Sequence, residues 1–279
     1  MTLTPPLIEF TLQDAPALLD LSESIGWPHE LLDWQAALSA SRVFGHRDAN
    51  GTVLSSSAIY IFSPEFAALA LVIVREEQRG LGLARAAVLE CLRQAPNAAI
   101  LLVATEYGEP LYLNLGFHTV QQIVRLIAPR GSTFPACAKE CRRTRESDLA
   151  AVLDLDRIAY GADRSCVLRQ RWANAERGAV IHDANGRMQG FAWMTRQRGG
   201  LIIAPVIASG AEEAIALLGE LTEGSSDHLK IEVPDTQVRF IESLRSAGFA
   251  IDSSRALMLK SAEIPPGQRS LIFALASLG

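Results

Sequence analysis

The sequence predicts an α/β protein that contains two copies of one fold. The chain has 279 residues, whereas a usual domain has about 100–200, so two domains are expected. Residues 67–104 have the pattern of a buried strand, a glycine loop, a helix and a second buried strand. Short segments of the first half also recur in the second half in the same order. The strand and helix pattern indicates the fold class, and the recurrence indicates its duplication.

The first strand of this unit is a continuous apolar run over residues 67–74, which predicts burial on both faces. Residues 83–95 are rich in Ala and Leu and favour a helix that stops before a proline. A second buried strand is predicted over residues 98–104. The chain therefore places a loop containing Gly80 and Gly82 between a buried strand and the start of a helix.

The repeat is carried by three short segments. At offsets of 132 to 135 residues, residues 11–21 recur as 144–155, residues 48–51 as 183–186, and residues 116–117 as 248–249. The second of these contains Asn-Gly between apolar runs, which is a strong hairpin signal. The repeat predicts a domain over residues 1–130, a linker over 131–138 and a second domain over 139–279. Turn chemistry that is common to α/β chains is the alternative explanation.

The composition limits the possible partners. Hydrophobic residues make up 49% of the chain and charged residues 20%, which excludes a disordered or fibrous protein. The net charge of −5 is not that of a nucleic-acid-binding protein or of a protein that coats anionic membranes. No stretch approaches the roughly 18 apolar residues of a membrane span, and residues 1–6 lack the features of a secretion signal. We therefore expect a cytoplasmic protein.

Metal binding is not expected either. The four cysteines are sparse, and only Cys137 and Cys141 have the separation of half a metal site. No second Cys or His pair follows at the spacing of a zinc site. Reduced thiols in a cytoplasmic protein are the better interpretation.

The glycine loop is suited to hold phosphate. Gly80 and Gly82 allow the backbone to approach a ligand without a Cβ clash. The free N–H groups of the loop and of the helix N-terminus attract an anion, and Arg79 and Arg85 add positive charge. A plain strand-to-helix turn is the alternative. A dinucleotide loop fits less well, because Arg85 stands where G-x-G-x-x-G/A needs a small residue, although Glu106 lies about where a ribose-binding acid would stand.

A better match is R-x-x-G-x-A, formed by Arg79, Gly82 and Ala84. This pattern resembles the pyrophosphate-binding motif of the GNAT family of acetyl-CoA-dependent N-acetyltransferases. Residues 108–117, which carry Tyr112 before Gly-Phe, resemble the second motif of that family. The resemblance covers residues 8–126, and the repeat extends it to residue 260. The whole chain resembles a tandem GNAT protein with an intact first copy and a degenerate second copy.

The resemblance implies two tandem GNAT folds of the α/β (α+β) class, each with a mixed, mostly antiparallel central sheet flanked by helices. The cofactor of that family lies in a wedge between two splayed parallel strands, here those ending at Val74 and Ala104. A backbone N–H near Ile73 would then stabilise the oxyanion that develops on the thioester carbonyl. The implied acetyl-CoA contacts are Val72, Ile73, Val74, Arg79, Gly80, Leu81, Gly82, Leu83, Ala84 and Arg85.

The resemblance also places Tyr112 beside the departing sulfur. A tyrosine pKa is ordinarily about 10 and a thiol pKa about 8.5, so proton transfer from Tyr112 is uphill unless the site changes these values. Stabilisation of the thiolate by a hydrogen bond is therefore an alternative to proton donation, and a buried packing role is another. Cys91 lies inside the predicted helix, which disfavours an acetyl-cysteine intermediate.

The sequence leaves the general base and the acceptor pocket open. Glu106 follows the second strand and is a candidate base, as are Glu30 and Asp33 in the segment expected to cover the substrate, and ordered water could serve instead. Trp27 and Trp34 flank that segment. We expect Trp27, Glu30 and Trp34 to line the acceptor pocket, although tryptophans often serve packing alone.

Two positions depart from the family pattern. Thr105 stands where many members have Asn, and Gly108 stands where they have Ala. The borrowed hydrogen bond from the Asn position to pantetheine is therefore in doubt.

The second copy has lost the phosphate loop. Residues 209–213 contain one glycine, no arginine and two carboxylates, and like charges repel a phosphate. We expect no acetyl-CoA there. Residues 160–164 resemble a signature in the C-terminal halves of tandem GNAT proteins. Asp163 and Arg164 either shape an acceptor pocket or form an ion pair at a turn, and the second interpretation is favoured.

The sequence thus predicts an enzyme whose N-terminal domain moves an acetyl group from acetyl-CoA to an amine of a small molecule or peptide by direct attack. A non-catalytic acyl-CoA sensor or partner-binding module is the alternative. The acidic first half favours a cationic amine. A monomer or a homodimer is expected.

Overall fold

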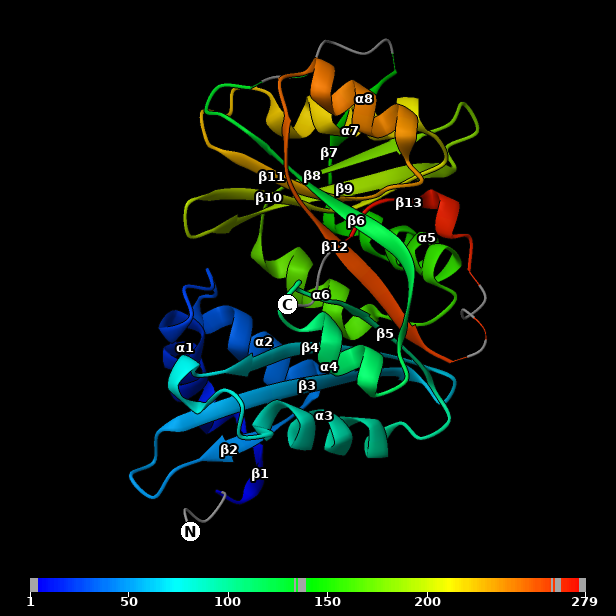
Figure 1. Cartoon of the computed structure of the whole chain (residues 1–279). Coiled ribbons are helices and arrows are strands. Elements are labelled where there is room, and N and C mark those ends of the chain that lie inside the picture. Colours follow the sequence, from blue (N-terminus) through cyan, green and yellow to red (C-terminus); the bar gives the residue numbers. More distant parts are fainter. Residues whose placement is uncertain (1–4, 133, 135–138, 262, 264–266, 276–279) are drawn as a thin grey trace.

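The computed structural model describes residues 5–132, 134, 139–261, 263 and 267–275. We call β1 to β6 the N-terminal half and β7 to β13 the C-terminal half (Figure 1). Cys137, one of the two cysteines with the separation of half a metal site, and most of the predicted linker lie outside the described residues.

The two halves have the same order of strands and α-helices up to β6 and β12, and the C-terminal half has β13 in addition. The N-terminal half contains β1 (Leu7–Phe10), α1 (Ala15–Ser24), α2 (Leu31–Ala40), β2 (Arg42–Arg47), β3 (Val53–Ser63), β4 (Phe66–Val74), α3 (Leu83–Gln94), β5 (Ala99–Val103), α4 (Glu109–Asn114) and β6 (His118–Ala128). The C-terminal half contains β7 (Cys141–Arg143), α5 (Leu149–Tyr160), α6 (Ser165–Asn174), β8 (Ala175–His182), β9 (Met188–Gln197), β10 (Gly200–Ala208), α7 (Ala211–Thr222), β11 (Leu229–Pro234), α8 (Val238–Ser246), β12 (Ala250–Lys260) and β13 (Ile272–Ala274). Short 3₁₀ turns lie at Leu12–Asp14, Glu76–Gln78, Glu146–Asp148 and Arg269–Leu271. The unit predicted over residues 67–104 is present as β4, α3 and β5.

The three repeated segments form the same local structure twice. In each hairpin turn, the carboxylate of Asp48 or Asp183 accepts the N–H groups two and four residues later, at 2.9 Å in every case. Before α1 and α5, the carboxylate of Asp14 or Asp148 accepts the N–H three residues earlier at 2.8 Å. Each Gly-Phe segment closes the preceding helix with the phenylalanine N–H bonded to the carbonyl oxygen five residues earlier at 3.0 Å. The duplication is therefore present in the structure as well as in the amino-acid sequence.

The strands that the structure describes form one mixed sheet that runs through both halves. The order is β1-β2-β3-β4-β5-β12-β6-β11-β10-β9-β8-β7, with β13 paired to β10. Only β4 with β5 and β10 with β11 pair in parallel. The predicted mixed, mostly antiparallel sheet flanked by helices is confirmed.

The last strands of the two halves are exchanged. Strand β12 of the C-terminal half pairs with β5, and β6 of the N-terminal half pairs with β11. The two exchanged strands also pair with each other over most of their length and cross the middle of the molecule side by side (Figure 1). The domain boundaries expected near residues 130 and 139 stay a prediction of the sequence. In the structure, β6 pairs only with strands of the other half.

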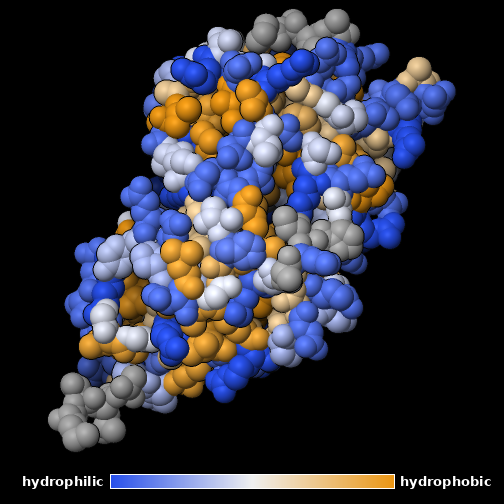
Figure 2. Space-filling model, turned by 45° about the vertical axis from the view of Figure 1, so that its right-hand side comes forward, coloured by the Kyte–Doolittle hydropathy of each residue, from blue (hydrophilic) through white to orange (hydrophobic). Residues whose placement is uncertain are grey.

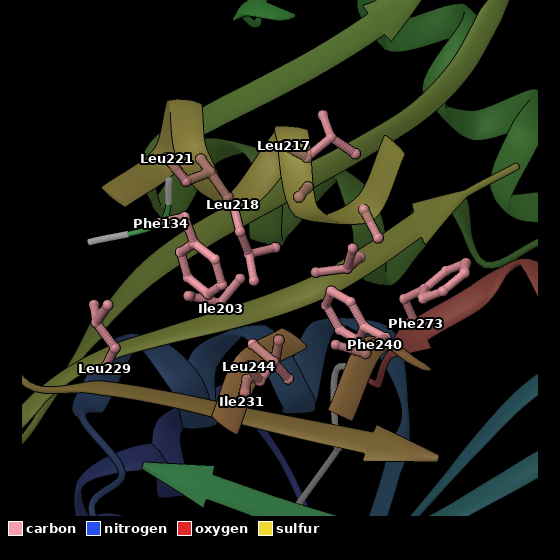
Figure 3. Close-up of a cluster of buried hydrophobic side chains, with 14 of the residues drawn as sticks. Phe134, Ile203, Leu217, Leu218, Leu221, Leu229, Ile231, Phe240, Leu244 and Phe273 are labelled. Carbon is pink, nitrogen blue, oxygen red and sulfur yellow. The ribbon is translucent and has the colours of Figure 1, made fainter. Parts of the chain in front are cut away.

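Apolar side chains of the helices cover both faces of the sheet. In the C-terminal half, leucines of α7 and the apolar face of α8 pack on strands β10 and β11 (Figure 3). In the N-terminal half, α3 and α4 cover one face and α1 and α2 cover the other. Helix α6 of the C-terminal half joins the second group, because Val167 packs with the cluster around Trp34 of α2. The two halves therefore share a core as well as a sheet.

The surface alternates in character. On the face shown in Figure 2, hydrophobic residues form several separate patches between hydrophilic ones. Within the described ranges, no helix is long and apolar enough to cross a membrane.

The strand exchange predicts that the two sequence copies do not fold independently. Fragment 1–130 alone leaves β5 without β12 on one edge and β6 without both of its partners, and unpaired strand edges aggregate. We expect each of the fragments 1–130 and 139–279 to aggregate when expressed alone, and the two to form a one-to-one complex when co-expressed. Size-exclusion chromatography and circular dichroism, with the intact chain as control, check this. A monomeric fragment 1–130 with cooperative thermal unfolding would contradict it, because β6 would then have returned to β5.

Candidate active site

The site begins where two parallel strands separate. Strands β4 and β5 pair only from Phe66 with Ala99 to Ala68 with Leu101. Beyond Ala68, β4 continues to Val74 without pairing to β5. Its peptide groups on that side therefore face a gap in the sheet.

A β-bulge in β4 lies beside this gap. Ser56 of β3 pairs with Ile73 and Ala58 pairs with Ala70, so one residue of β3 faces two of β4. At the bulge Leu71 has a φ of +53°, which is uncommon for a residue other than glycine. Its carbonyl oxygen accepts a hydrogen bond of 2.7 Å from the Ser56 hydroxyl. Backbone strain held in place by its surroundings is typical of functional sites.

One cavity of about 720 Å³ occupies the gap and reaches both faces of the sheet. Leu69, Leu102 and Tyr112 line it and belong to the core on the α3 face. Phe66 and Leu101 also line it and belong to the core of the opposite face. The cavity therefore passes through the sheet, so that two ligands could meet in it from opposite sides.

The glycine loop forms one end of the cavity. Gly80 has a φ of +80° and Gly82, the residue before α3, a φ of +78°. No atom lies within 4 Å of where a Cβ would stand at either glycine, so the space beside the loop is open. The guanidinium of Arg79 lies 4.9 Å from the ring centroid of Tyr107 and forms an ion pair with Glu76.

Nine of the ten cofactor contacts expected from the sequence line this cavity. The exception is Leu81, whose side chain points to solvent and is 61% exposed. The lining residues are Val72, Ile73, Val74, Arg79, Gly80, Gly82, Leu83, Ala84 and Arg85.

Tyr112 lies in the cavity wall on α4. The residue is buried and packs edge-on against Phe117, with 5.8 Å between ring centroids. Burial raises the pKa of Tyr112 above its ordinary value, so the phenol stays protonated. A Cβ at Gly108 would lie 3.2 Å from the Tyr112 ring and 3.3 Å from the Thr105 hydroxyl. The departure to Gly at this position therefore makes room for the tyrosine and for Thr105.

Other candidates lie outside the cavity. Glu106 and Glu30 are exposed, and neither is among the lining residues. The N–H of Glu30 is bonded to the Asp33 carboxylate at 2.8 Å, which caps α2. Cys91 is fully buried, and burial raises its pKa to about 12, so its thiol is inert. The structure thus brings Tyr112 and the loop together, whereas Glu30 and Glu106 lie outside and Asp33 lines only a second cavity.

A second cavity of about 290 Å³ lies between α2, α6 and the exchanged strands. It shares Trp27, Leu71 and Arg255 with the first cavity, so the two adjoin at the bulge. Trp34 lines it but is fully buried, and its Nε1 donates to the Ser22 hydroxyl at 2.9 Å. Of the expected acceptor-pocket residues, Trp27 and Trp34 line a cavity and Glu30 does not.

His29 also lines the second cavity. Its Nδ1 lies 3.0 Å from the Ser22 hydroxyl. Burial lowers the pKa of His29, and the nearby Asp33 carboxylate offsets this only in part. Nothing in the spacing of His29 along the chain marks it as a site residue.

The C-terminal half covers the open side of the first cavity. Tyr160, Arg164, Arg255 and Arg269 line it together with Leu257 and Leu275. Sequence reasoning missed all of these except Arg164, because they reach the cavity only through the strand exchange and the packing of α5 and α6.

The predicted ion pair between Asp163 and Arg164 is wrong, because Arg164 pairs with another carboxylate. Arg164 is buried and donates to the Asp156 carboxylate of α5 at 2.7 and 3.1 Å. Asp163 is exposed and instead accepts the Ser165 N–H at 2.8 Å. The guanidinium points inward, where the paired carboxylate is, rather than along the turn.

The corresponding loop of the second copy is occupied by its own side chains. Gly210 has an extended backbone, and a Cβ there would lie 2.8 Å from the Glu213 carboxylate. Lys139 forms ion pairs with Glu212 and Glu213. These contacts support the expectation that this copy binds no phosphate.

Comparison with known proteins agrees with the fold and the repeat. The model of the acetyltransferase (GNAT) family matches residues 11–117, and that of an acetyltransferase (GNAT) domain matches residues 152–274. The uncharacterized N-acetyltransferase YitH of Bacillus subtilis (strain 168) is 27% identical over 282 residues, which cover 99% of both chains.

Solved structures show the same architecture. A putative acetyltransferase from Pyrococcus horikoshii has a TM-score of 0.81 at 14% identity, covering 100% of this chain and 96% of that one. A tandem GNAT protein from the clavulanic acid biosynthesis pathway has a TM-score of 0.66 at 15% identity, covering 92% and 98%. Fold, family models and curated relative together define an acyltransferase. The chain belongs to the GNAT family and contains two GNAT domains.

Two histidines, the partly buried His29 and the buried His46, predict a loss of stability at mildly acidic pH. Burial lowers the pKa of His29 and His46 in the folded protein. The unfolded chain therefore binds protons below about pH 6.5 that the folded chain does not, and stability falls as the pH falls. We expect Tm to drop by about 2–4 °C between pH 7.5 and 5.5, the equivalent of roughly 1 kcal/mol.

Differential scanning fluorimetry checks this prediction. His29→Gln should reduce the drop, and His118→Gln, at an exposed position, should leave it unchanged. A Tm that is flat over this range would contradict the expected cost of protonation.

Proposed function

We propose that this acyltransferase binds acetyl-CoA in its N-terminal half and transfers the acetyl group directly to an amine of a small molecule or peptide. The observation that carries the proposal is the single cavity that crosses the sheet where β4 and β5 separate, with the glycine loop at one end. A cavity of this form lets a thioester and an amine approach each other from opposite faces.

The residues present fit the phosphates of acetyl-CoA. The loop has open space beside Gly80 and Gly82, N–H groups at the start of α3, and the positive charges of Arg79 and Arg85. No carboxylate occurs among the described residues that line the cavity. Backbone N–H groups at a helix N-terminus and guanidinium groups are the usual ligands of phosphate.

The chain's own groups account for the chemical step. The amine nitrogen attacks the thioester carbon and the carbon–sulfur bond breaks. A backbone N–H of β4 beyond the bulge, near Ile73, would stabilise the developing oxyanion. Because its pKa is raised by burial, Tyr112 would keep its proton and donate a hydrogen bond to the leaving thiolate.

The proton of the amine needs an acceptor. The described part of the cavity wall contains neither carboxylate nor imidazole, and Glu106 is exposed. This supports water as the acceptor of the proton over a side chain.

Gly82→Asp tests the cofactor site. A carboxylate at the start of α3 would repel phosphate, and we expect affinity for acetyl-CoA to fall by about tenfold or more. The matched control is Gly186→Asp, at a turn in the other half. There the glycine has the same φ of +78° and equally open surroundings.

Isothermal titration calorimetry on the three proteins measures the difference. Wild-type protein that binds no acetyl-CoA would refute the proposal. Equal weakening by both substitutions would show that the effect comes from backbone strain instead of charge.

Tyr112→Phe tests the transfer step. We expect kcat to fall by about 100-fold while acetyl-CoA affinity stays unchanged, because the ring still fills the cavity wall. The assay is thiol release from acetyl-CoA over a panel of amines, with the wild-type protein as the control. Unchanged kcat would remove Tyr112 from the mechanism. Acetyl-CoA binding without thiol release to any amine would favour the non-catalytic sensor.

A further inference from the structure

Three polar side chains of the C-terminal half gather at the acceptor side of the cavity. Tyr160 is the last residue of α5, Arg164 precedes α6, and Arg269 begins the 3₁₀ turn Arg269–Leu271. All three line the cavity together with Phe66 and Leu101 of the N-terminal half. They lie on the side of the sheet opposite Tyr112.

Two of these side chains have buried donors without partners. Tyr160 is 5% exposed, and its hydroxyl is buried and makes no hydrogen bond. The Nε and Nη2 atoms of Arg269 are also buried without a hydrogen-bond partner. Buried polar groups in folded proteins are nearly always hydrogen-bonded. Three such atoms on one cavity wall therefore indicate a ligand that accepts hydrogen bonds.

The unpartnered edge of Arg269 is the edge that binds carboxylates elsewhere in this chain. Arg164 donates hydrogen bonds to the Asp156 carboxylate through Nε and Nη2. Arg42 donates to the Glu9 carboxylate through the same two atoms. These two N–H groups are parallel and match the two oxygens of a carboxylate. Arg269 lines the cavity, and in it the same fork of two atoms has no hydrogen-bond partner among the described residues.

The positive charge of Arg269, uncompensated among the described residues, also favours the binding of an anion. Asp156 compensates Arg164, whose guanidinium carbon lies 3.2 Å from the Tyr160 ring centroid. No described residue forms an ion pair with Arg269. Burial and the nearby charge of Arg164 both lower the pKa of Arg269. Burial raises the pKa of Tyr160, so its hydroxyl remains a donor.

We propose that Arg269 and Tyr160, beside the ion pair of Arg164 with Asp156, bind a carboxylate of the acceptor, so that the acceptor is an amino-acid-like compound with an amine and a carboxylate. This rests on the proposed function, because it places the amine of the same molecule at the opening between β4 and β5. The fork of Arg269 and the hydroxyl of Tyr160 supply donors to the two oxygens. The carboxylate in turn neutralises Arg269, as Asp156 neutralises Arg164.

The test measures binding without turnover. Protein saturated with CoA is titrated calorimetrically with each proteinogenic L-amino acid, with the amide of each, and with acetate and inorganic phosphate. We expect at least one amino acid to bind, and its amide to bind about tenfold or more weakly, since a hydrogen-bonded charge is lost. Arg269→Gln should weaken the amino acid to a similar extent, and Arg269→Lys should restore only part of the affinity.

Two further variants separate binding from folding. Tyr160→Phe should weaken amino-acid binding and leave Tm of the free protein unchanged, because the hydroxyl has no partner to lose. Arg157→Gln changes an exposed arginine of α5 and should alter neither property.

Four results would overturn the proposal. The first two are amides that bind as tightly as amino acids, and no amino-acid binding at all. The other two are phosphate as the sole ligand, and an Arg269→Gln protein with unchanged affinity. Thiol release from acetyl-CoA distinguishes this failure from failure of the proposed function. Release only with amines that lack a carboxylate would leave the function standing and remove the carboxylate site. Amino-acid binding that depends on Arg269, with no thiol release, would leave the carboxylate site standing and remove the proposed function.

Discussion

The pairing of β12 with β5 is the contact on which the arrangement of the site depends. It covers the edge of β5 from Ile100 to Val103 with a strand from the other half of the chain. The same strand carries Arg255 and Leu257 into the cavity wall. Because β6 completes the other half in return by pairing with β11, neither half has a full sheet of its own. The cavity is therefore built by the whole chain.

The separation of β4 and β5 is the second constraint. Parallel pairing ends at Ala68 and Leu101, and the bulge at Leu71 turns the following residues of β4 relative to β3. A sheet that stayed closed here would fill the space with side chains and backbone hydrogen bonds. In this protein, the unpaired edge of β4, the start of α3 and the ring of Tyr112 converge on one opening. The proposed acyl transfer would use these three features together, since the start of α3 would hold phosphate, the edge of β4 would face the carbonyl and Tyr112 would face the sulfur.

Sequence reasoning predicted what depends on local signals. The apolar run over residues 67–74, the helix beginning at Leu83 and the turns at Asp48 and Asp183 all follow from propensity and turn chemistry, and all are present. The motif around Gly82 led to the family. The strand exchange was not predictable in this way, because β6 and β12 have the same pattern whichever sheet partner they take. Arg255 and Arg269 were missed for the same reason: each is far in sequence from the loop, and only tertiary pairing brings it to the cavity. Glu106 and Glu30 were chosen for their position in the chain, but exposed carboxylates at these positions do not reach the cavity wall.

The distribution of charge shows why local geometry outweighs composition in choosing a substrate. The first half of the chain is acidic, which predicted a cationic amine as acceptor. The described cavity wall, however, carries five arginines and no carboxylate. Two of the arginines come from the glycine loop and three from the C-terminal half, whose net charge is zero. Its own phosphate loop is closed by the ion pairs between Lys139 and the glutamates of α7. In the proposed function the C-terminal half therefore contributes no cofactor loop, but its fold brings Tyr160, Arg164 and Arg269 to the cavity that the glycine loop lines. Three buried donors without partners among the described residues, the Tyr160 hydroxyl and the Nε and Nη2 of Arg269, belong to residues of this half that line the cavity.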